Sequence, residues 1–195
     1  MLAKVEKYCT SLLSSTNIKK LPFHNLLHTQ EVVQNAKFLC KEMHISRTDK
    51  ELLLMAAWFH DTGFIETYSG HEEISKKLAT EFLRGIGLEK PSIQVVTDCI
   101  DATIIPQSPT SQLQEILCDA DVYHTSNLNF YYRKLLLRRE WELFCDLKKS
   151  DKEWHELNLV FLKNLHFKTS YGKRVLEGGK QENIEKVEQI LRYYE

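Results

Sequence analysis

The sequence contains few of the residues that interrupt helices. Its 195 residues include only seven glycines and four prolines, and three of those prolines lie between positions 91 and 109. Valine and isoleucine almost never alternate with polar residues at the period of two that strands show, whereas apolar residues recur at helical spacing. The sequence therefore predicts an all-α protein, and it has no internal repeat, low-complexity segment or linker.

Cysteine pairs and long apolar runs are also missing. The five cysteines are scattered, odd in number and never arranged as C-x-x-C. The first residues contain no apolar run typical of a signal peptide, and no stretch approaches the roughly 20 apolar residues of a membrane span. We therefore expect a cytoplasmic protein without a membrane partner, whose thiols are reduced and mostly buried.

A charge excess of either sign is absent as well. The formal net charge is −1 with histidine neutral, which argues against a broad nucleic-acid or anionic-membrane surface but leaves room for a local basic pocket. Hydrophobic residues make up 43% of the chain and charged residues 27%, as in ordinary globular proteins. A chain of this length can form one domain with a proper core.

Helical spacing and stop signals divide the chain into segments. The residues 14–17 break the first helix, Pro106 and Pro109 end the fifth, and a turn at 170–172 and a loop around Gly178 and Gly179 precede the last. The predicted helices cover residues 2–14, 28–39, 49–60, 71–85, 91–104, 113–123, 129–147, 151–167 and 183–194.

One polar pair stands where an apolar segment ends. His60 and Asp61 follow the run from Leu52 to Phe59. Burying an unpaired imidazole or carboxylate in a core-facing helix costs several kcal/mol. A cation removes that penalty because it pairs with both groups at once, so we interpret His60 and Asp61 as adjacent ligands of a divalent metal ion.

Two histidines precede this pair in the chain. His24 and His28 are four residues apart, and they project from the same side if their helix begins early enough. Either both bind metal, or one binds metal while the other faces substrate. A surface pair or a satisfied core pair is the alternative that these residues leave open.

Two further polar residues lie at helix ends. Asp121 follows Leu117 by four residues on the apolar face of its predicted helix, whereas Asp119 points elsewhere. The partner of Asp121 is a metal, unless it forms a buried ion pair or ends in an exposed final turn. His71 opens a helix after a loop at 64–70, and it points either into the pocket or into solvent.

A long basic and aromatic helix is predicted at residues 129–147. We expect most of its charges to form a solvated face. One or two of its cations could instead reach a phosphate, which bidentate arginine suits; the four are Arg133, Lys134, Arg138 and Arg139.

The inward-facing side chains form a plausible ligand set of His28, His60, Asp61 and Asp121. Two imidazoles and two carboxylates suit a borderline or hard divalent ion such as Mn²⁺, Fe²⁺, Zn²⁺, Co²⁺ or Mg²⁺, and the lack of a thiolate disfavours a closed structural zinc site. An ion with an open position would lower the pKa of a bound water and polarise a phosphoryl oxygen. Hydrolysis of a phosphate ester is the predicted reaction.

The order H…HD…D on a helical chain resembles the HD superfamily of metal-dependent phosphohydrolases. The matching residues are His28, the doublet His60-Asp61, and Asp121 as the aspartate of an Ala-Asp-x-φ pattern. The resemblance covers roughly residues 20–130. It implies a single-domain helical bundle over residues 1–195 with a central metal site, on which the C-terminal helices from about 130 to 195 pack. It also implies hydrolysis of a nucleotide or similar small phosphate ester by metal-activated water, which Asp61 would orient.

The segment His24-Asn25-Leu26-Leu27-His28 is similar to the H-N-x-x-H motif of the cyclic-nucleotide phosphodiesterases, a branch of this superfamily. That similarity implies a metal ligand at His28 and a general acid at His24, a task that imidazole suits near neutral pH.

His71 sits where some two-metal members place another ligand. Those enzymes need one more histidine on the next helix, and residues 99–103 contain none. We therefore expect one metal per chain, with His71 contacting substrate phosphate or a weak second ion. The alternatives are a cyclic-nucleotide phosphodiesterase, a non-catalytic ligand-sensing HD module and, third, a di-iron oxygenase; a homodimer is allowed.

Overall fold

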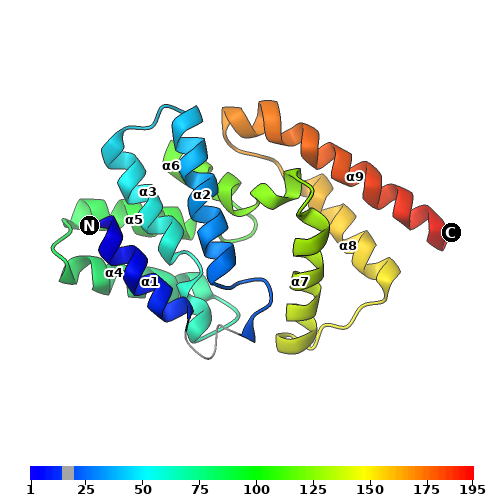
Figure 1. The fold of residues 1–195 in the computed structure, drawn as a ribbon, viewed down its shortest axis with the longest axis horizontal. Coiled ribbons are helices and arrows are strands. Elements are labelled where there is room, and N and C mark those ends of the chain that lie inside the picture. Colours follow the sequence, from blue (N-terminus) through cyan, green and yellow to red (C-terminus); the bar gives the residue numbers. More distant parts are fainter. Residues whose placement is uncertain (15–19) are drawn as a thin grey trace. The chain divides into compact units, whose positions relative to one another are not determined.

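The computed structural model describes residues 1–14 and 20–195. This part of the chain contains nine α-helices and no strand (Figure 1), which confirms the all-α prediction. The expected break at 14–17 lies mostly outside the described residues. The fifth, seventh, eighth and ninth helices end three residues earlier than predicted. The bounds are α1 Leu2–Leu13, α2 Leu26–Glu42, α3 Arg47–Phe59, α4 His71–Gly85, α5 Lys90–Asp101, α6 Gln112–Asp121, α7 Phe130–Phe144, α8 Asp151–Asn164 and α9 Glu177–Leu191.

The helices group into two compact units, Met1–Asp121 and Val122–Glu195. The first unit contains α1 to α6 and a short 3-10 helix, η2 (Thr62–Ile65). The second contains α7 to α9, the 3-10 helices η3 (Tyr123–Ser126) and η5 (Arg192–Tyr194), and a π-helix, η4 (Gly172–Leu176). That the C-terminal helices pack on the core stays a prediction.

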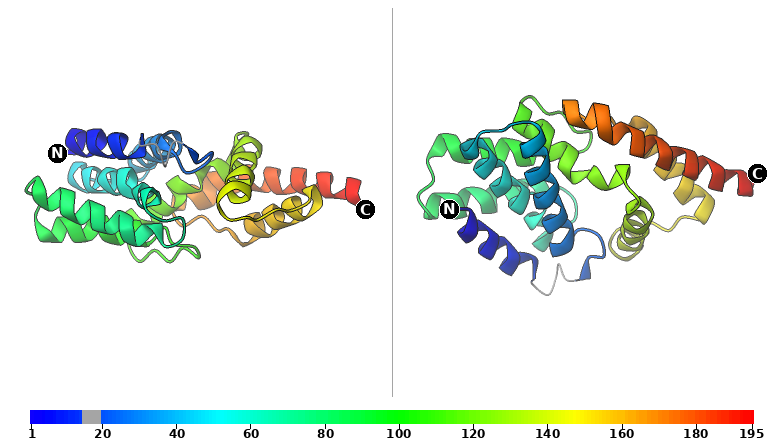
Figure 2. Two further views of the ribbon diagram at one scale, coloured as in Figure 1. Left: turned by 90° about the horizontal axis from the view of Figure 1, so that it is seen from below. Right: turned by 45° about the horizontal axis from the view of Figure 1, so that its top comes forward.

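Helix α3 is the centre of the first unit. It contacts each of the other five α-helices of that unit, and α4 and α5 lie side by side next to it (Figure 2). Its last eight residues, 52–59, are all buried. An apolar run without a polar face is what a helix enclosed by neighbours requires. The chain leaves α3 at Phe59, so His60 and Asp61 emerge inside the unit.

The cysteines agree with the sequence-based prediction. All five cysteines are free, and four of them are buried, with Cys145 exposed. This confirms the prediction of mostly buried thiols. None of the described helices is long and apolar enough to cross a membrane.

The C-terminal helix begins earlier than predicted. Gly178 and Gly179 lie inside α9. Residues 170–172, predicted as a turn, are helical and continue into the π-helix η4, so both expectations of irregular structure were wrong. The reason is a tertiary contact. The amide of Asn183 donates to the backbone oxygens of Thr125 (2.9 Å) and Asn127 (3.0 Å). A Cβ on Gly179 would lie 1.9 Å from the Ser126 oxygen, so this glycine permits close packing that outweighs its weak helix propensity.

Two neighbouring glycines offer a matched test of that contact. Gly179→Ala should lower the free energy of unfolding by about 2 kcal/mol, and Tm by roughly 5 °C, because the new methyl group collides with the Ser126 carbonyl. Gly178→Ala meets nothing within 4 Å and should stabilise the helix slightly. Thermal unfolding followed by circular dichroism checks both, and equal effects of the two variants would contradict the assigned contact.

The basic face of α7 is less solvated than predicted. Arg133 is 1% exposed and Lys134 4% exposed, so for these two residues the prediction was wrong. The rings of Phe130 and Tyr131 on α7 and of His155 on α8 lie against the Lys134 side chain. Arg138 donates to Asp151 at 2.7 Å and Arg139 to Glu142 at 3.2 Å.

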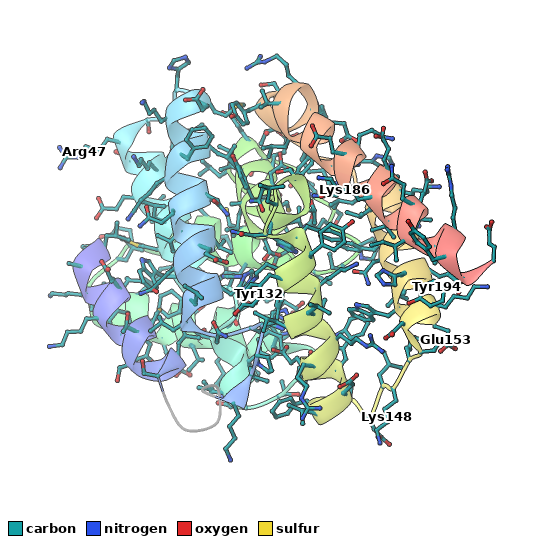
Figure 3. All side chains as sticks on the ribbon, turned by 45° about the vertical axis from the view of Figure 1, so that its right-hand side comes forward. Arg47, Tyr132, Lys148, Glu153, Lys186 and Tyr194 are labelled. Carbon is teal, nitrogen blue, oxygen red and sulfur yellow. The ribbon has the colours of Figure 1, made fainter. Side chains whose placement is uncertain are left out.

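Helix α8 begins at a capping box formed by Ser150 and Glu153, and Glu153 is labelled in Figure 3.

Candidate metal centre

Three predicted ligands from separate helices converge in the first unit. His28 on α2, His60 at the end of α3 and Asp121 on α6 each present a ligand atom, and these atoms lie within 4.8 Å of one another. The Oδ1 atom of Asp121 is 3.1 Å from His28 Nε2 and 3.7 Å from His60 Nε2. Because α2, α3 and α6 contact each other pairwise, their packing sets this arrangement.

Asp61 adds a second carboxylate to the cluster. Its Oδ2 atom lies 3.4 Å from His28 Nε2 and 3.3 Å from His60 Nε2. Neighbouring ligands on an ion with bonds of about 2.1 Å are about 3.0–3.4 Å apart. Asp61 Oδ2 therefore lies beside both imidazoles, although among the described residues only His28, His60 and Asp121 have ligand atoms that all converge within 4.8 Å.

The hydrogen bonding of the cluster suits a divalent cation. His60 Nδ1 donates to the Ala57 carbonyl at 2.8 Å, which turns the lone pair of Nε2 toward the other ligands. His60 Nε2 and Asp61 Oδ2 are both buried, and neither has a hydrogen bond of normal geometry. Buried polar atoms are rarely left this way. A divalent cation is the partner that this donor set suits.

Electrostatics keeps both carboxylates ionised. Burial would raise the pKa of Asp61, but the charge and contact of His60, with the contact of His71, lower it well below the usual value. Burial opposes ionisation of Asp121 too, and contacts with His28 and His60 lower its pKa. Both residues can therefore act as anionic ligands at neutral pH.

The pKa values of the two imidazoles, His28 and His60, are shifted in opposite directions. Burial lowers the pKa of His28 in spite of Asp121 and Asp61, so this ring is neutral, as a ligand must be. Burial also disfavours charge on His60, but Asp61 and then Asp121 outweigh it and raise the pKa of His60 well above its usual value. A proton and a cation compete for His60 Nε2.

His24 reaches the cluster by a route other than the predicted helical face. Helix α2 begins at Leu26, so His24 precedes it, yet the His24 and His28 rings are 5.8 Å apart. Asn25 makes this possible as the N-cap. Its oxygen accepts from the backbone of Leu27 and His28, and its amide donates to two carbonyls of the incoming chain.

His71 is directed at the cluster rather than into solvent. Its Nε2 lies 3.4 Å from Asp61 Oδ1, and its Nδ1 lies 3.6 Å from Glu72 Oε2. The ring of Phe64 stacks on His71 at 3.8 Å and lies 4.5 Å from His24. Glu72 and Phe64 were not predicted as site residues, because they read as an ordinary first-turn acid and an apolar loop residue.

Asp119 stays apart from the ligand group. It was expected to point elsewhere, and it is fully buried, whereas the side chain of Asp121 is 21% exposed. Among the described residues, the group of converging ligand atoms contains Asp121 and not Asp119.

Comparison with known proteins gives one family and one related fold. The family model of the HD domain matches residues 25–126. No curated protein matches the chain. A crystal structure of a structural-genomics target from Lactobacillus plantarum has a TM-score of 0.75 and 16% sequence identity, and the match covers 99% of this chain and 96% of that one. At that identity the likeness supports the fold alone.

Proposed function

The chain belongs to the HD-domain family, and from this premise we propose that it is a metal-dependent phosphohydrolase that cleaves a nucleotide or a similar small phosphate ester. Members of the family are generally metal-dependent hydrolases, although some are non-catalytic. One observation carries the proposal. His28, His60 and Asp121 present ligand atoms within 4.8 Å of one another, Asp61 Oδ2 lies beside both imidazoles, and the buried His60 Nε2 and Asp61 Oδ2 have no hydrogen bond.

The proposed ligands are His28, His60, Asp61 and Asp121, and the proposed ion is Mn²⁺, Fe²⁺, Zn²⁺, Co²⁺ or Mg²⁺, one per chain. Bound there, a divalent cation supplies a water of lowered pKa and neutralises charge on a phosphoryl oxygen.

The second oxygen of Asp61 has a separate role. Oδ2 faces the ligand cluster, whereas Oδ1 faces His71. His71 lies between the Asp61 and Glu72 carboxylates, which orient its ring. We assign to Asp61 and His71 the orientation of the attacking water, with His71 also able to donate a hydrogen bond to a phosphoryl oxygen.

His24 is the proposed general acid. Its half-buried ring lies beside His28 without being one of the converging ligands, and Phe64 packs against it. From there it can give a proton to the leaving oxygen. This arrangement of His24, Asn25 and His28 also favours the second candidate, a cyclic-nucleotide phosphodiesterase.

A hydrolysis assay tests the proposal. The purified protein should release product from a panel of nucleoside monophosphates, cyclic nucleotides and chromogenic phosphate mono- and diesters when Mn²⁺ or Co²⁺ is present, and it should stop with chelator. Preference for cyclic diesters would select the phosphodiesterase. Ligand binding without turnover across the panel would indicate a sensing module, and two bound irons with O₂ uptake an oxygenase; either result contradicts the proposal. Cytoplasmic location and a homodimer stay predictions.

Gly63 gives a prediction about the geometry of the site. Its backbone N–H donates to Ser75 Oγ at 2.8 Å, and a Cβ there would lie 1.9 Å from the His71 carbonyl oxygen. Gly63→Ala must therefore displace the first turn of α4. We expect kcat to fall by roughly 10²-fold or more, because a shift of about 1 Å in a catalytic group has that effect.

The matched control is Gly85→Ala, at the other end of α4. A Cβ at Gly85 meets nothing within 4 Å, so activity should be unchanged. Steady-state kinetics and metal content are measured on both variants. Full activity of Gly63→Ala would show that the contact between Gly63 and α4 does not position the site.

A further inference from the structure

A buried lysine in the second unit has no acidic partner. Lys134 on α7 is 4% exposed, and its Nζ lies 3.2 Å from His155 Nδ1 on α8. The same Nζ lies 4.4 Å from the centre of the Tyr131 ring and 5.5 Å from that of Phe130. No carboxylate of the described residues comes within ion-pair distance of it.

A second buried lysine of the same unit has the acidic partner that Lys134 lacks. Lys180 is 2% exposed, but its Nζ pairs with Glu177 at 2.6 Å and donates to the Leu165 carbonyl. Buried charges in proteins are normally paired in this way. Lys134 has only a ring nitrogen and aromatic faces, so its ammonium form is poorly compensated.

The acid that acts on His155 is already paired. This residue, Asp151, accepts a hydrogen bond from Arg138 at 2.7 Å. Burial lowers the pKa of Lys134 to about 8. At about pH 7.4, roughly one Lys134 side chain in five is then an amine, against about one in a thousand for an ordinary lysine. Burial, followed by the positive charge of Lys134, lowers the pKa of His155, so that ring is a neutral acceptor.

We propose that Lys134 is a carbamate-forming site for carbon dioxide, with His155 as the proton acceptor. The Nζ lone pair forms a bond to the carbon, one carbon–oxygen π pair moves onto oxygen, and one Nζ proton passes to His155 Nδ1. The products are a lysine carbamate anion and an imidazolium cation, with no change of oxidation state.

Two features select this electrophile. Because Lys134 is only 4% exposed, its amine is accessible to a small neutral molecule but not to a bulky aldehyde or acyl donor. The carbamate product carries a negative charge, which the surroundings of Lys134 lack. This charge lies beside His155. The buried hydroxyl of Tyr131, which has no hydrogen-bond partner among the described residues, can donate to a carbamate oxygen.

The experiment uses the whole protein equilibrated with carbon-13 bicarbonate near neutral pH and observed by carbon-13 NMR. The terminal α-amine of a protein also forms carbamates. We therefore expect two carbamate signals, of which Lys134→Met loses one. His155→Phe should weaken that signal about tenfold, because a charged hydrogen bond is lost. A wild-type spectrum with only the N-terminal signal overturns the proposal.

A second measurement is independent of the folding of the variants. Carbamates of the wild-type protein are trapped by alkylation and located by peptide mass spectrometry. The adduct should lie on the peptide that contains Lys134 and be absent from that with Lys180. Equal trapping at both lysines, or none at Lys134, overturns the assignment, and an undiminished signal in His155→Phe overturns the role of His155.

Discussion

Asp61→Ala should abolish metal-dependent hydrolysis. The side chain lies within 3.4 Å of His28 and His60 through one oxygen and of His71 through the other, so its loss removes a ligand and the link to His71 together. Loss of an outer-shell partner alone typically reduces metal affinity or activity 10–100-fold, so loss of a ligand should reduce activity by roughly 10³-fold or more. Metal analysis after dialysis and kcat/KM with added Mn²⁺ measure both effects.

The helical fold should survive this substitution. The buried run 52–59 of α3 and its contacts with five helices do not depend on the carboxylate. Asp98→Ala is the matched control, because Asp98 is an exposed aspartate on α5 that accepts a hydrogen bond from Gln94. That variant should keep metal and activity. An Asp61→Ala protein that retains metal and turnover would remove Asp61 from the ligand set.

The apolar helix and the doublet were predictable because they depend on local pattern. A run of eight apolar residues can be buried on all sides, and a polar pair directly after it must find partners inside the protein. The position of Asp121 followed in the same way from its spacing to Leu117 in α6, and Asp121, not Asp119, joins His28 and His60. That it binds metal stays a prediction.

Contacts between distant residues were not predictable in this way. The predicted reason for the proximity of His24 and His28 was a shared helical face, whereas the structure uses the cap at Asn25. The helical state of Gly178 and Gly179 depends on the approach of α9 to Ser126. The helix propensities of the residues do not predict such a contact. The burial of Lys134 likewise depends on a contact with a residue distant in the sequence, His155 on α8.

His24→Ala should separate catalysis from metal binding. If His24 gives a proton to the leaving oxygen, its removal should reduce kcat by about 10²–10⁴-fold while the metal content stays at the wild-type value. We expect kcat to fall without loss of metal because the ring of His24 lies beside that of His28 but supplies no atom to the converging ligand group.

Two comparisons make this result specific. His166→Ala removes an exposed histidine between α8 and η4 and should leave kcat unchanged. Added imidazole should partly restore turnover of His24→Ala, because the half-buried position is accessible to a small base. Substrates whose leaving group needs no protonation, such as nitrophenyl esters, should be affected least. Loss of metal from His24→Ala would instead make His24 a ligand and transfer the general-acid role to His71, whose ring the Asp61 and Glu72 carboxylates already orient.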